Sequence, residues 1–356
     1  MDKTLFDLYT DYLLCSFGSV TATGLSQLVD GAVSHDQITR LLAGEEKRSA
    51  HLWQKVKPLV RQVERADGVI IIDDSVAEKP YTDENELICW HWDNAKERNV
   101  KGINFLTALY HVPGVSLPVA YDLVTKTEGY YDAKAKKEKR RSALSKNARF
   151  RTLLQVCVHN EIPFEYVLAD LWYASADNMT FVVKVLHKHF VMPLKSNRKI
   201  ALSADDQQQG RYTTVDTLAL TPDQTREIWL EEVPFALLLT QEVFTNKDGS
   251  TGERYLVTDD LTLTYDQITK LYQKRWSVEV YHEALKQNAS LEKSPTRTET
   301  TQRNHVFASL CAYVKLESVK LKTGVNQFAL KSKIYAAALK TAYQEIVKLA
   351  PVSLGA

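Results

Sequence analysis

The chain has few cysteines, no long apolar stretch and no excess of charge of either sign. Its four cysteines (Cys15, Cys89, Cys157 and Cys311) lie far apart in 356 residues, with no Cys-x2-Cys spacing. They therefore predict neither a zinc site nor a disulfide framework. No apolar run approaches the roughly 18 residues of a transmembrane helix, and the start does not resemble a signal peptide. We expect a protein of the reducing cytoplasm that does not enter a membrane.

The charge balance leaves the class of partner open. The 45 basic and 44 acidic residues give a net charge of +1. Such a balance neither requires nor excludes nucleic acid, so the clustering of the basic residues matters more than their number. Hydrophobic residues make up 44% of the chain, which supports a packed core, and the length is sufficient for two or three domains.

The first 65 residues have the pattern of a helical domain. Apolar residues between positions 5 and 17 recur at helical spacing. After Gly31, Ser34 and Gln37 form a capping box that begins a second helix. This order is typical of a helix-turn-helix, with the helix at 35–42 entering the major groove of DNA. A small helical bundle without DNA contact is an equally good interpretation.

From residue 68 the pattern becomes that of strands and helices in alternation. Residues 69–72 are a β-branched apolar run, typical of a strand buried on both faces, which ends in Asp73-Asp74-Ser75. A second buried strand, at 166–168, leads to Asp170. The other expected elements are strands at 100–112, 115–126 and 189–194, and helices at 150–159 and 175–188. This order predicts a mixed α/β sheet.

The second half of the chain is expected to be β-rich and then helical. Residues 200–262 hold predicted strands at 236–244 and 254–258, around a turn at 246–249. A long helix follows at 265–288, and 300–349 form two more. The expected domains are a helical DNA-binding domain (1–65), a catalytic core in two parts (66–199 and 263–299), a β-rich insertion between those parts (200–262) and C-terminal helices (300–356).

A dense basic segment lies between the first strands and the helix at 150–159. Asp132 and Glu138 are the acids within it. Its basic residues are Lys134, Lys136, Lys137, Lys139, Arg140, Arg141, Lys146 and Arg149. Two interpretations remain open, the solvated face of a helix or a surface for the phosphate backbone of a nucleic acid.

The candidate chemistry lies at the ends of the two buried strands. Asp73 and Asp170 each follow an apolar run, and open α/β sheets bind their ligands at such carboxyl ends. A third acid is expected from the long helix. One face of that helix combines a phenol, a guanidinium, a carboxylate and an ammonium within roughly 60° of one another, at about 100° per residue. These are Tyr272, Arg275, Glu279 and Lys286. Ordinary ion pairs on a solvated helix face are the alternative.

Three short motifs carry a family resemblance. Asp73-Asp74-Ser75 has the form Asp-x-Ser/Thr, Asp170-Leu171-Trp172-Tyr173 has the form Asp-x2-Tyr, and the helix has the form Tyr-x2-Arg-x3-Glu-x6-Lys. In this combination the chain resembles the hairpin-forming DDE transposases of bacterial insertion sequences. Further similarities at 101–104, 117–119 and 189–198 extend the resemblance over roughly residues 68–310.

The spacing of the three acids agrees with the resemblance. Asp73 and Asp170 are 97 positions apart, and Asp170 and Glu279 are 109 positions apart. The second interval is too long for the helix and strand that normally separate those acids. It matches the β-rich insertion that the family carries within a ribonuclease-H-like core.

The resemblance also implies a cofactor and partners. Two Mg²⁺ ions, for which Mn²⁺ could substitute, would be held by Asp73, Asp170 and Glu279 and would promote in-line phosphoryl transfer on DNA. The residues expected to bind DNA are Tyr272, Arg275, Lys286, Lys195 and Arg198. In this family a 3′-hydroxyl attacks the opposite strand and closes a DNA hairpin. The expected partners are the terminal inverted repeats of the chain's own element, target DNA and a second copy of the chain.

Other acids could take the place of these ligands. Asp74 could replace Asp73, although the family's first motif begins at Asp73. Glu283 lies near Glu279 on the helix, but it lacks the offsets to the tyrosine, the arginine and the lysine. The pair Asp259-Asp260 could mimic a metal site, and we interpret it as the turn into the long helix.

The family holds a flipped base on aromatic side chains, one of them a tryptophan of the insertion. Trp229 is a weak candidate because its distance from Glu279 does not match the pattern, and a core position is the better interpretation. Phe244 and Tyr255 are alternatives. Trp276 is similar to a family position but could equally serve packing.

Three functions are therefore open. The first is a transposase that cuts element ends as a dimer. The second is a ribonuclease-H-like nuclease that only hydrolyses DNA, which would not need the Tyr/Arg/Lys face. The third is a domesticated DNA-binding protein without catalysis, against which the presence of all three acids argues.

Overall fold

The computed structural model describes residues 3–93, 96–133, 136–218, 220–221, 223–245 and 248–349. The chain divides into two compact units. One consists of Met1–Lys47 and His282–Ala356, and the other of Arg48–Tyr281. Both ends of the chain therefore belong to the same unit.

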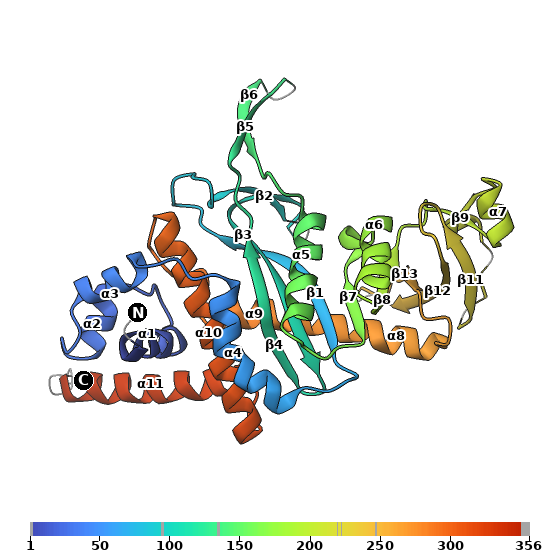
Figure 1. The fold of residues 1–356 in the computed structure, drawn as a ribbon. Helices are drawn as coiled ribbons and strands as arrows, with labels where there is room; N and C mark the ends of the chain where they lie inside the picture. Colours follow the sequence, from blue (N-terminus) through green and yellow to red (C-terminus); the bar gives the residue numbers. More distant parts are fainter. Residues whose placement is uncertain are drawn as a thin grey trace. The chain divides into compact units, whose positions relative to one another are not determined.

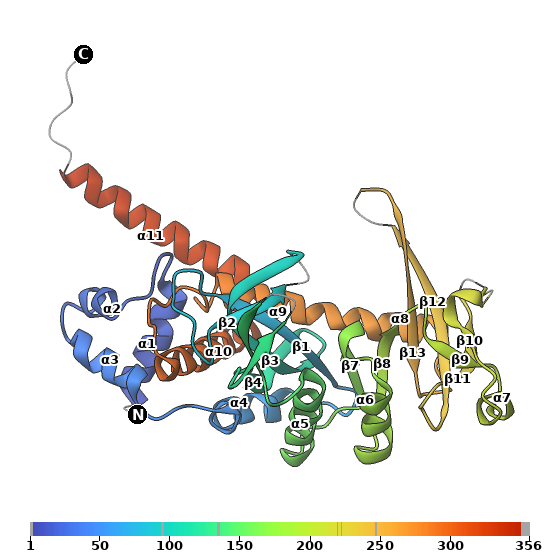
Figure 2. The same cartoon turned by 90° about the horizontal axis from the view of Figure 1, so that it is seen from above.

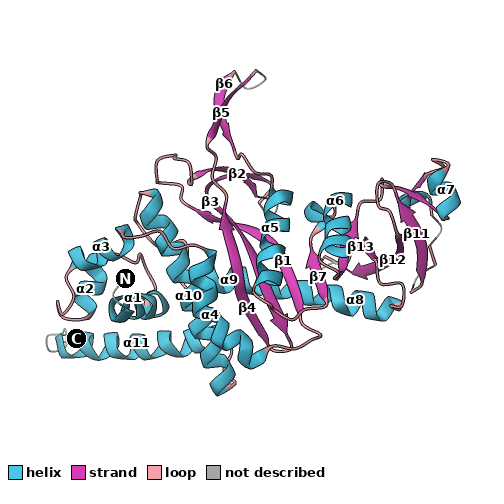
Figure 3. Ribbon diagram, viewed as in Figure 1, coloured by secondary structure: helices cyan, strands magenta, loops and turns pink. Residues whose placement is uncertain are grey.

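The unit of the two chain ends is helical in its described residues (Figure 3). Its elements are α1 (Lys3–Cys15), α2 (Ala22–Leu28), α3 (His35–Ala43), the end of α9 (Ser277–Gln287), α10 (Glu299–Thr323) and α11 (Gln327–Leu349). The rings of Phe6 and Phe307 stack at 5.5 Å, and the hydroxyl of Tyr9 lies 2.9 Å from Nδ1 of His305. These contacts join α1 to α10. The two predicted C-terminal helices are confirmed, as is the capping box of Ser34 and Gln37.

The unit Arg48–Tyr281 is built around a large sheet. Its helices are α4 (Ser49–Val63), α5 (Lys146–His159), α6 (Ala176–Thr180), α7 (Ala204–Gln208), α8 (Tyr265–Gln273) and the first turn of α9. Its strands are β1 (Val69–Glu78), β2 (Cys89–Asp93), β3 (Arg98–Val112), β4 (Val115–Leu123), β5 (Glu128–Asp132), β6 (Lys137–Arg141), β7 (Tyr166–Ala169), β8 (His189–Leu194), β9 (Lys199–Ala201), β10 (Thr213–Thr214), β11 (Thr225–Leu230), β12 (Ala236–Thr245) and β13 (Thr251–Thr258). In Figure 2 the sheet lies between α4, α5 and α6 on one side and α8 on the other.

The sheet is mixed, as the sequence predicts. Its strand order in the described residues is β10-β9-β11-β12-β13-β8-β7-β1-β3-β2, with β4 on β3. β7 lies between β1 and β8 and is parallel to both, whereas β1 and β3 are antiparallel. The β-branched run at the start of β1 is buried on both faces, because strands pair on both its sides and helices cover the sheet.

One expectation about the strands is corrected by the pairing. β1 does not end at Asp73 but continues to Glu78, because the long β3 pairs with it over its whole length. The parallel partner β7 pairs only with its first four residues. The strands at 200–262 pair edge to edge with β8 through β13, so they extend the core sheet.

The predicted strands at 236–244 and 254–258 are confirmed as β12 and β13. Of the turn expected between them, Asn246 and Lys247 lie outside the described residues. The turn expected at 113–114 is also confirmed, with Gly114 in the left-handed region at φ +83, where a residue without Cβ is least strained.

The basic segment is not a single helix. β5 and β6 pair with each other as a separate two-stranded hairpin, which projects from the unit beyond β2 and β3 (Figure 1). Lys134 lies outside the described residues. Lys146 and Arg149 belong to α5, whose first turn is capped by the Ser145 hydroxyl. Arg149 is buried and pairs with Asp122, so its charge is used within the fold.

The long helix at 265–288 is interrupted. α8 ends at Gln273, a 3₁₀ turn follows at Lys274–Trp276, and α9 begins at Ser277. α8 packs against β8 and β13. Among the described residues, none of the helices has the length and apolar character that crossing a lipid bilayer requires.

Candidate active site

Strand pairing brings Asp73 and Asp170 to neighbouring positions. The last pair in the parallel ladder of β1 and β7 joins Ile72 to Ala169, and the next residue of each strand is one of the two acids. Parallel strands lie about 4.8 Å apart, and residues in register point to the same face. Two segments whose acids are 97 positions apart in sequence thus place two carboxylates side by side.

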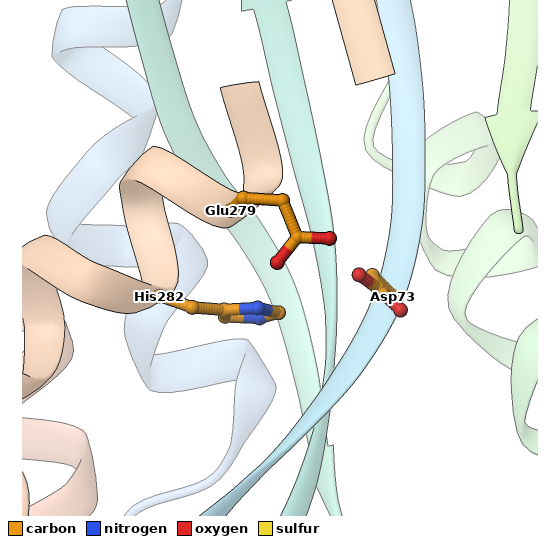
Figure 4. A group of neighbouring side chains, drawn as sticks. All are labelled: Asp73, Glu279 and His282. Atoms are coloured by element: carbon orange, nitrogen blue, oxygen red, sulfur yellow. The ribbon is translucent and has the colours of Figure 1, made fainter. Parts of the chain in front are cut away.

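Helix α9 places a third carboxylate against this edge of the sheet. A carboxylate oxygen of Asp73 and one of Glu279 lie within 4.8 Å of each other, and Figure 4 shows the two side chains facing one another. The residue paired with Asp73 on β3 is Thr107. Its hydroxyl lies 3.3 Å from that of the buried Tyr281, two residues after Glu279, and this contact anchors the helix above the sheet.

Figure 4 also draws His282, one helical turn after Glu279 on α9. Residues three apart are neighbours on a helix surface, so the imidazole projects from the same side as the carboxylate. The sequence analysis does not include this histidine. Its spacing from Glu279 is the signal that could have indicated it.

Burial, and then neighbouring charges, raise the pKa values of the two aspartates. Burial raises the pKa of Asp73 well above its usual range, the negative charges of Asp170, Asp74 and Glu279 raise it further, and Arg275 acts in the opposite direction. Burial also raises the pKa of Asp170. The backbone N–H of Trp172, which donates a hydrogen bond to Oδ1 of Asp170 at 2.9 Å, acts in the opposite direction. Converging carboxylates that are costly to ionise are a suitable environment for a divalent cation.

Asp74 points to the other side of β1 and is fully engaged there. Its carboxylate accepts hydrogen bonds from the Lys146 ammonium, the Asn104 amide and the Tyr173 hydroxyl, each at 2.7 Å. Burial tends to raise the pKa of Asp74, but these three donors outweigh burial and hold the pKa below its ordinary value. This side chain is therefore committed to the fold.

Arg275 is the cation nearest to the acids among the contacts of the described residues. Its Nη1 lies 3.6 Å from Oδ2 of Asp73 and 3.3 Å from Oε1 of Glu279. Its guanidinium lies 5.7 Å from the ring centre of Tyr272. The 3₁₀ turn explains this contact, since residues three apart eclipse one another in that geometry. The sequence-predicted tyrosine, arginine and glutamate are thus brought together.

Arg254 of β13 is a residue that the sequence analysis missed. Its guanidinium lies 4.7 Å from the ring centre of Tyr272 and 5.3 Å from that of Phe244. Two hydrogen bonds to Oε2 of Glu242, at 3.0 and 2.7 Å, orient it. Glu242 and Arg254 are paired across β12 and β13, so a charge pattern across the predicted hairpin could have indicated the contact. Burial, followed by the opposing effects of two arginines, leaves the pKa of Tyr272 raised to about 12.

Lys286 lies farther along α9. It follows Glu279 by seven residues, which is about two turns or roughly 10 Å along a helix. Its ammonium is 3.7 Å from a carboxylate oxygen of Glu292. The expected face of four residues therefore has three members close together and a fourth two turns away.

A hollow of about 650 Å³ adjoins Asp170. Its lining residues include Lys146, Trp172 and Lys195. The Trp172 side chain is 62% exposed, and the Lys146 ammonium lies 5.8 Å from its ring centre. Lys195 thus lines the same hollow as the second acid. Arg198 instead donates to the Ala174 carbonyl at 3.4 Å. The sequence pointed to Lys146 only as part of the basic segment and to Trp172 only as a variable position of the second motif.

The other acidic candidates have structural partners. The Asp259 carboxylate accepts a hydrogen bond from the backbone N–H of Phe190 and pairs with His189. The Asp260 carboxylate accepts a hydrogen bond from the Tyr166 hydroxyl. The interpretation of this pair as a turn before α8 agrees with these bonds. Glu283 is exposed and accepts a hydrogen bond from Gln287.

The aromatic candidates differ in exposure. Trp229 is half-buried on β11, Phe244 is 37% exposed and Tyr255 is buried. Trp276 is 67% exposed, so packing does not explain it.

Comparison with protein families gives one finding that includes this site. A family described as a transposase DDE domain matches residues 64–315. The match takes in most of the chain and includes β1, β7 and α9 with their three acids. No curated protein matches the chain.

Proposed function

The chain belongs to the family of transposases with a DDE domain, and from this premise we propose that it catalyses cut-and-paste transposition of a bacterial insertion sequence. The observation that carries the proposal is that Asp73 lies beside Asp170 on neighbouring strands and within 4.8 Å of Glu279, measured between carboxylate oxygens. A ribonuclease-H-like core in two parts (66–199 and 263–299), with an insertion at 200–262, is the domain organisation that we infer.

The three acids would hold the metal. Transposases of this family use divalent ions. A bound cation would offset both the burial of the Asp73 carboxylate and its repulsion by the neighbouring acids, which raise the pKa of Asp73. Hard carboxylate oxygens favour Mg²⁺, with Mn²⁺ as a substitute. When bound, two such ions would neutralise the charge that develops during in-line phosphoryl transfer. Asp73 rather than Asp74 is the proposed ligand, because Asp74 already accepts three hydrogen bonds.

The cations around the acids would position DNA. Arg275 offers a planar fork to a phosphate and Tyr272 offers a hydroxyl. Lys195 would contact the strand that passes Asp170, and Lys286 and Arg198 would contact the backbone farther away. Phosphates held on both sides of the acids would let a 3′-hydroxyl reach the opposite strand, as closure of a DNA hairpin requires.

The remaining proposals concern partners. Residues 1–65 would bind the terminal repeats of the element, with α3 as the recognition helix of a helix-turn-helix. Target DNA would be the second substrate. The protein would act in the bacterial cytoplasm, on the DNA of the nucleoid. The active form would be a homodimer, for which α11 offers an exposed apolar face.

Cleavage and joining assays test the function. Purified protein is incubated with DNA carrying the element ends and Mg²⁺, and the products are resolved on denaturing gels. Asp73→Asn, Asp170→Asn and Glu279→Gln should each lower cleavage at least about a thousandfold, since removing one group from a preorganised charge-stabilising set costs about 10²–10³ or more. DNA binding should persist, because phosphate contacts elsewhere supply most of it.

Glu283→Gln is the matched control, since it removes an exposed carboxylate one turn away on the same helix. It should cleave normally. Near-normal cleavage by one of the three variants would remove that residue from the site. Cleavage by the unaltered protein without any joined product would favour the nuclease alternative.

A further inference from the structure

The β5–β6 hairpin stands apart from the large sheet. Its strands pair only with each other among the described residues, and it projects from the unit in Figure 1. Nearly all its described residues are exposed or half-exposed, including Tyr131 at 65%. An isolated two-stranded hairpin has little stability of its own, so a long exposed one is more useful as a binding element than as a part of the core.

Charge is neutralised on one part of the hairpin only. Lys139 forms an ion pair with Asp132, and Arg141 with Glu128 at 3.0 Å. Arg141 also lies 5.9 Å from the ring centre of Tyr130. These residues share one face, because Glu128, Tyr130 and Asp132 are in register with Arg141, Lys139 and Lys137. The charges on that face therefore largely neutralise one another.

Three cations remain available. Lys136, Lys137 and Arg140 are exposed and form no ion pair with the described residues. Lys136 lies in the turn, and Lys137 begins β6 on the face of the paired cations. Arg140 lies on the opposite face, which it shares with Tyr131 and Glu138. Among the described residues of the hairpin, Glu138 is the one acid that is not paired with a cation, and with Glu84 it lines the same hollow as Arg140 and Tyr131. The three unpaired cations therefore outnumber the unpaired acid of the hairpin, and an exposed phenol lies beside Arg140.

We propose that this hairpin is a β-ribbon arm that binds the phosphate backbone of double-stranded DNA through Lys136, Lys137 and Arg140. A two-stranded ribbon has the width that the major groove of B-DNA admits. Lysine and arginine neutralise phosphates and release counterions, and a tyrosine hydroxyl donates to phosphate or sugar. An excess of exposed, unpaired positive charge favours a polyanion over an apolar partner.

The arm rests on the proposed function for the identity of its substrate, but none of its residues belongs to the acidic site. Its contribution is therefore measurable without cleavage. Backbone contacts of this kind would hold DNA in register for the acids and would not depend on base sequence.

Salt-dependent DNA binding tests the arm in the full-length protein. Affinity for a labelled duplex is measured in EDTA at several salt concentrations, for the unaltered chain and for Lys136→Gln/Lys137→Gln/Arg140→Gln. The slope of log K against log salt is negative, and each lost phosphate contact should reduce its magnitude by about 0.9, so the triple variant should reduce it by roughly 2.7. Affinity at low salt should fall at least tenfold.

Two controls make the result specific. Lys322→Gln/Lys333→Gln/Lys340→Gln removes the same charge from exposed positions of α10 and α11 and should leave the slope within about 0.5 of the original. The charge-preserving variant Lys136→Arg/Lys137→Arg/Arg140→Lys should keep the slope. Circular dichroism and melting temperature should show that all variants fold.

The outcomes separate the arm from the function. If the unaltered chain binds DNA and the arm variant binds equally well with an equal slope, the arm inference is wrong and the function stands. Equal losses in the arm variant and the α10/α11 control also overturn it, since net charge then explains the effect. If the arm variant alone loses slope while the unaltered chain neither cleaves nor joins DNA, the arm is supported and the transposase proposal is not.

Discussion

Two adjacent aspartates have opposite electrostatic roles. Asp73 meets the negative charges of Asp170, Asp74 and Glu279, and burial and these charges raise its pKa. Asp74, one residue later, accepts hydrogen bonds from three donors that hold its pKa low. Strand alternation alone separates them, because successive side chains point to opposite faces. The negative charge of Asp73 therefore destabilises the fold, whereas the negative charge of Asp74 stabilises it.

Stability at neutral pH should change in opposite directions when each charge is removed. A carboxyl whose pKa is higher in the folded than in the unfolded protein binds its proton more tightly in the folded state. The resulting stability is fully present below the unfolded-state pKa and is lost as the pH rises through the folded-state pKa. Asp73→Asn should therefore raise the melting temperature of the metal-free protein at pH 7.5. About 1 kcal/mol corresponds to ~2–4 °C in a unit of this size. The gain should shrink as the pH falls towards 4.

Asp74→Asn is the paired experiment. A carboxyl with a lowered folded pKa contributes stability above its unfolded pKa, which is lost as the pH falls through the folded value. Removing this charge weakens hydrogen bonds to an ammonium, an amide and a hydroxyl, so the variant should lose about 1–3 kcal/mol at pH 7.5. Thermal melts in EDTA measure both variants. A lower melting temperature for Asp73→Asn would contradict the repulsive environment that we describe.

At the scale of the element, the 3₁₀ turn at Lys274–Trp276 divides a helix that the sequence pattern treats as continuous. It aligns Tyr272 with Arg275 and directs the guanidinium to the acids. Lys286 stays about two turns beyond Glu279. Tyr272 and Arg275 therefore lie at the acids whereas Lys286 lies at a distance from them, and we expect them to act in different steps of DNA end processing.

Lys286→Ala should separate the two steps of end processing. Nicking requires the acids and one bound phosphate, whereas hairpin closure also requires the second strand to be held. Loss of a charge-assisted contact of about 1.5–3 kcal/mol would slow hairpin formation roughly ten- to hundredfold while nicked DNA accumulates. Denaturing gels that resolve nicked strands from hairpins measure this. An exposed ion pair with Glu292 is worth only about 0–1 kcal/mol, and unchanged kinetics of both steps would show that Lys286 serves nothing more.

At the scale of the whole molecule, the exposed apolar face of α11 is the surface that we propose for the homodimer. Tyr335, Leu339 and Ile346 are each more than half exposed. Together with Ala342 and Leu349 they recur at alternating intervals of four and three residues, which is the spacing of a two-helix seam. A face of this kind is costly to leave in water.

Leu339→Glu/Ile346→Glu should abolish dimers of the protein on DNA ends. Two buried charges of the same sign in one seam oppose each other and cost several kcal/mol in total. Light scattering with size-exclusion chromatography, with and without DNA, measures the assembly. Lys340→Glu changes a charge on the polar side of the same helix and should leave assembly intact. Dimers that persist in the double variant would assign self-association to another surface.

The sequence by itself determined the elements whose pattern is local. β7, β8, β12 and β13 follow from short apolar runs between turn residues, and α10 and α11 follow from helical periodicity. The three candidate acids and the motifs around them were also recognisable, because each motif is a short stretch of chain.

Only the tertiary structure decided what depends on pairing between distant segments. The extension of β1 past Asp73 is due to β3, and the environment of Asp74 is due to α5 and β3. The contact of Arg254 with Tyr272 joins β13 to the helix that follows it. The hairpin at 128–141 carries a charge pattern equally suitable for a helix face. Which partner satisfies a charge or a strand edge is a property of the assembled fold, because hydrogen bonds and burial are shared between segments that no local pattern relates.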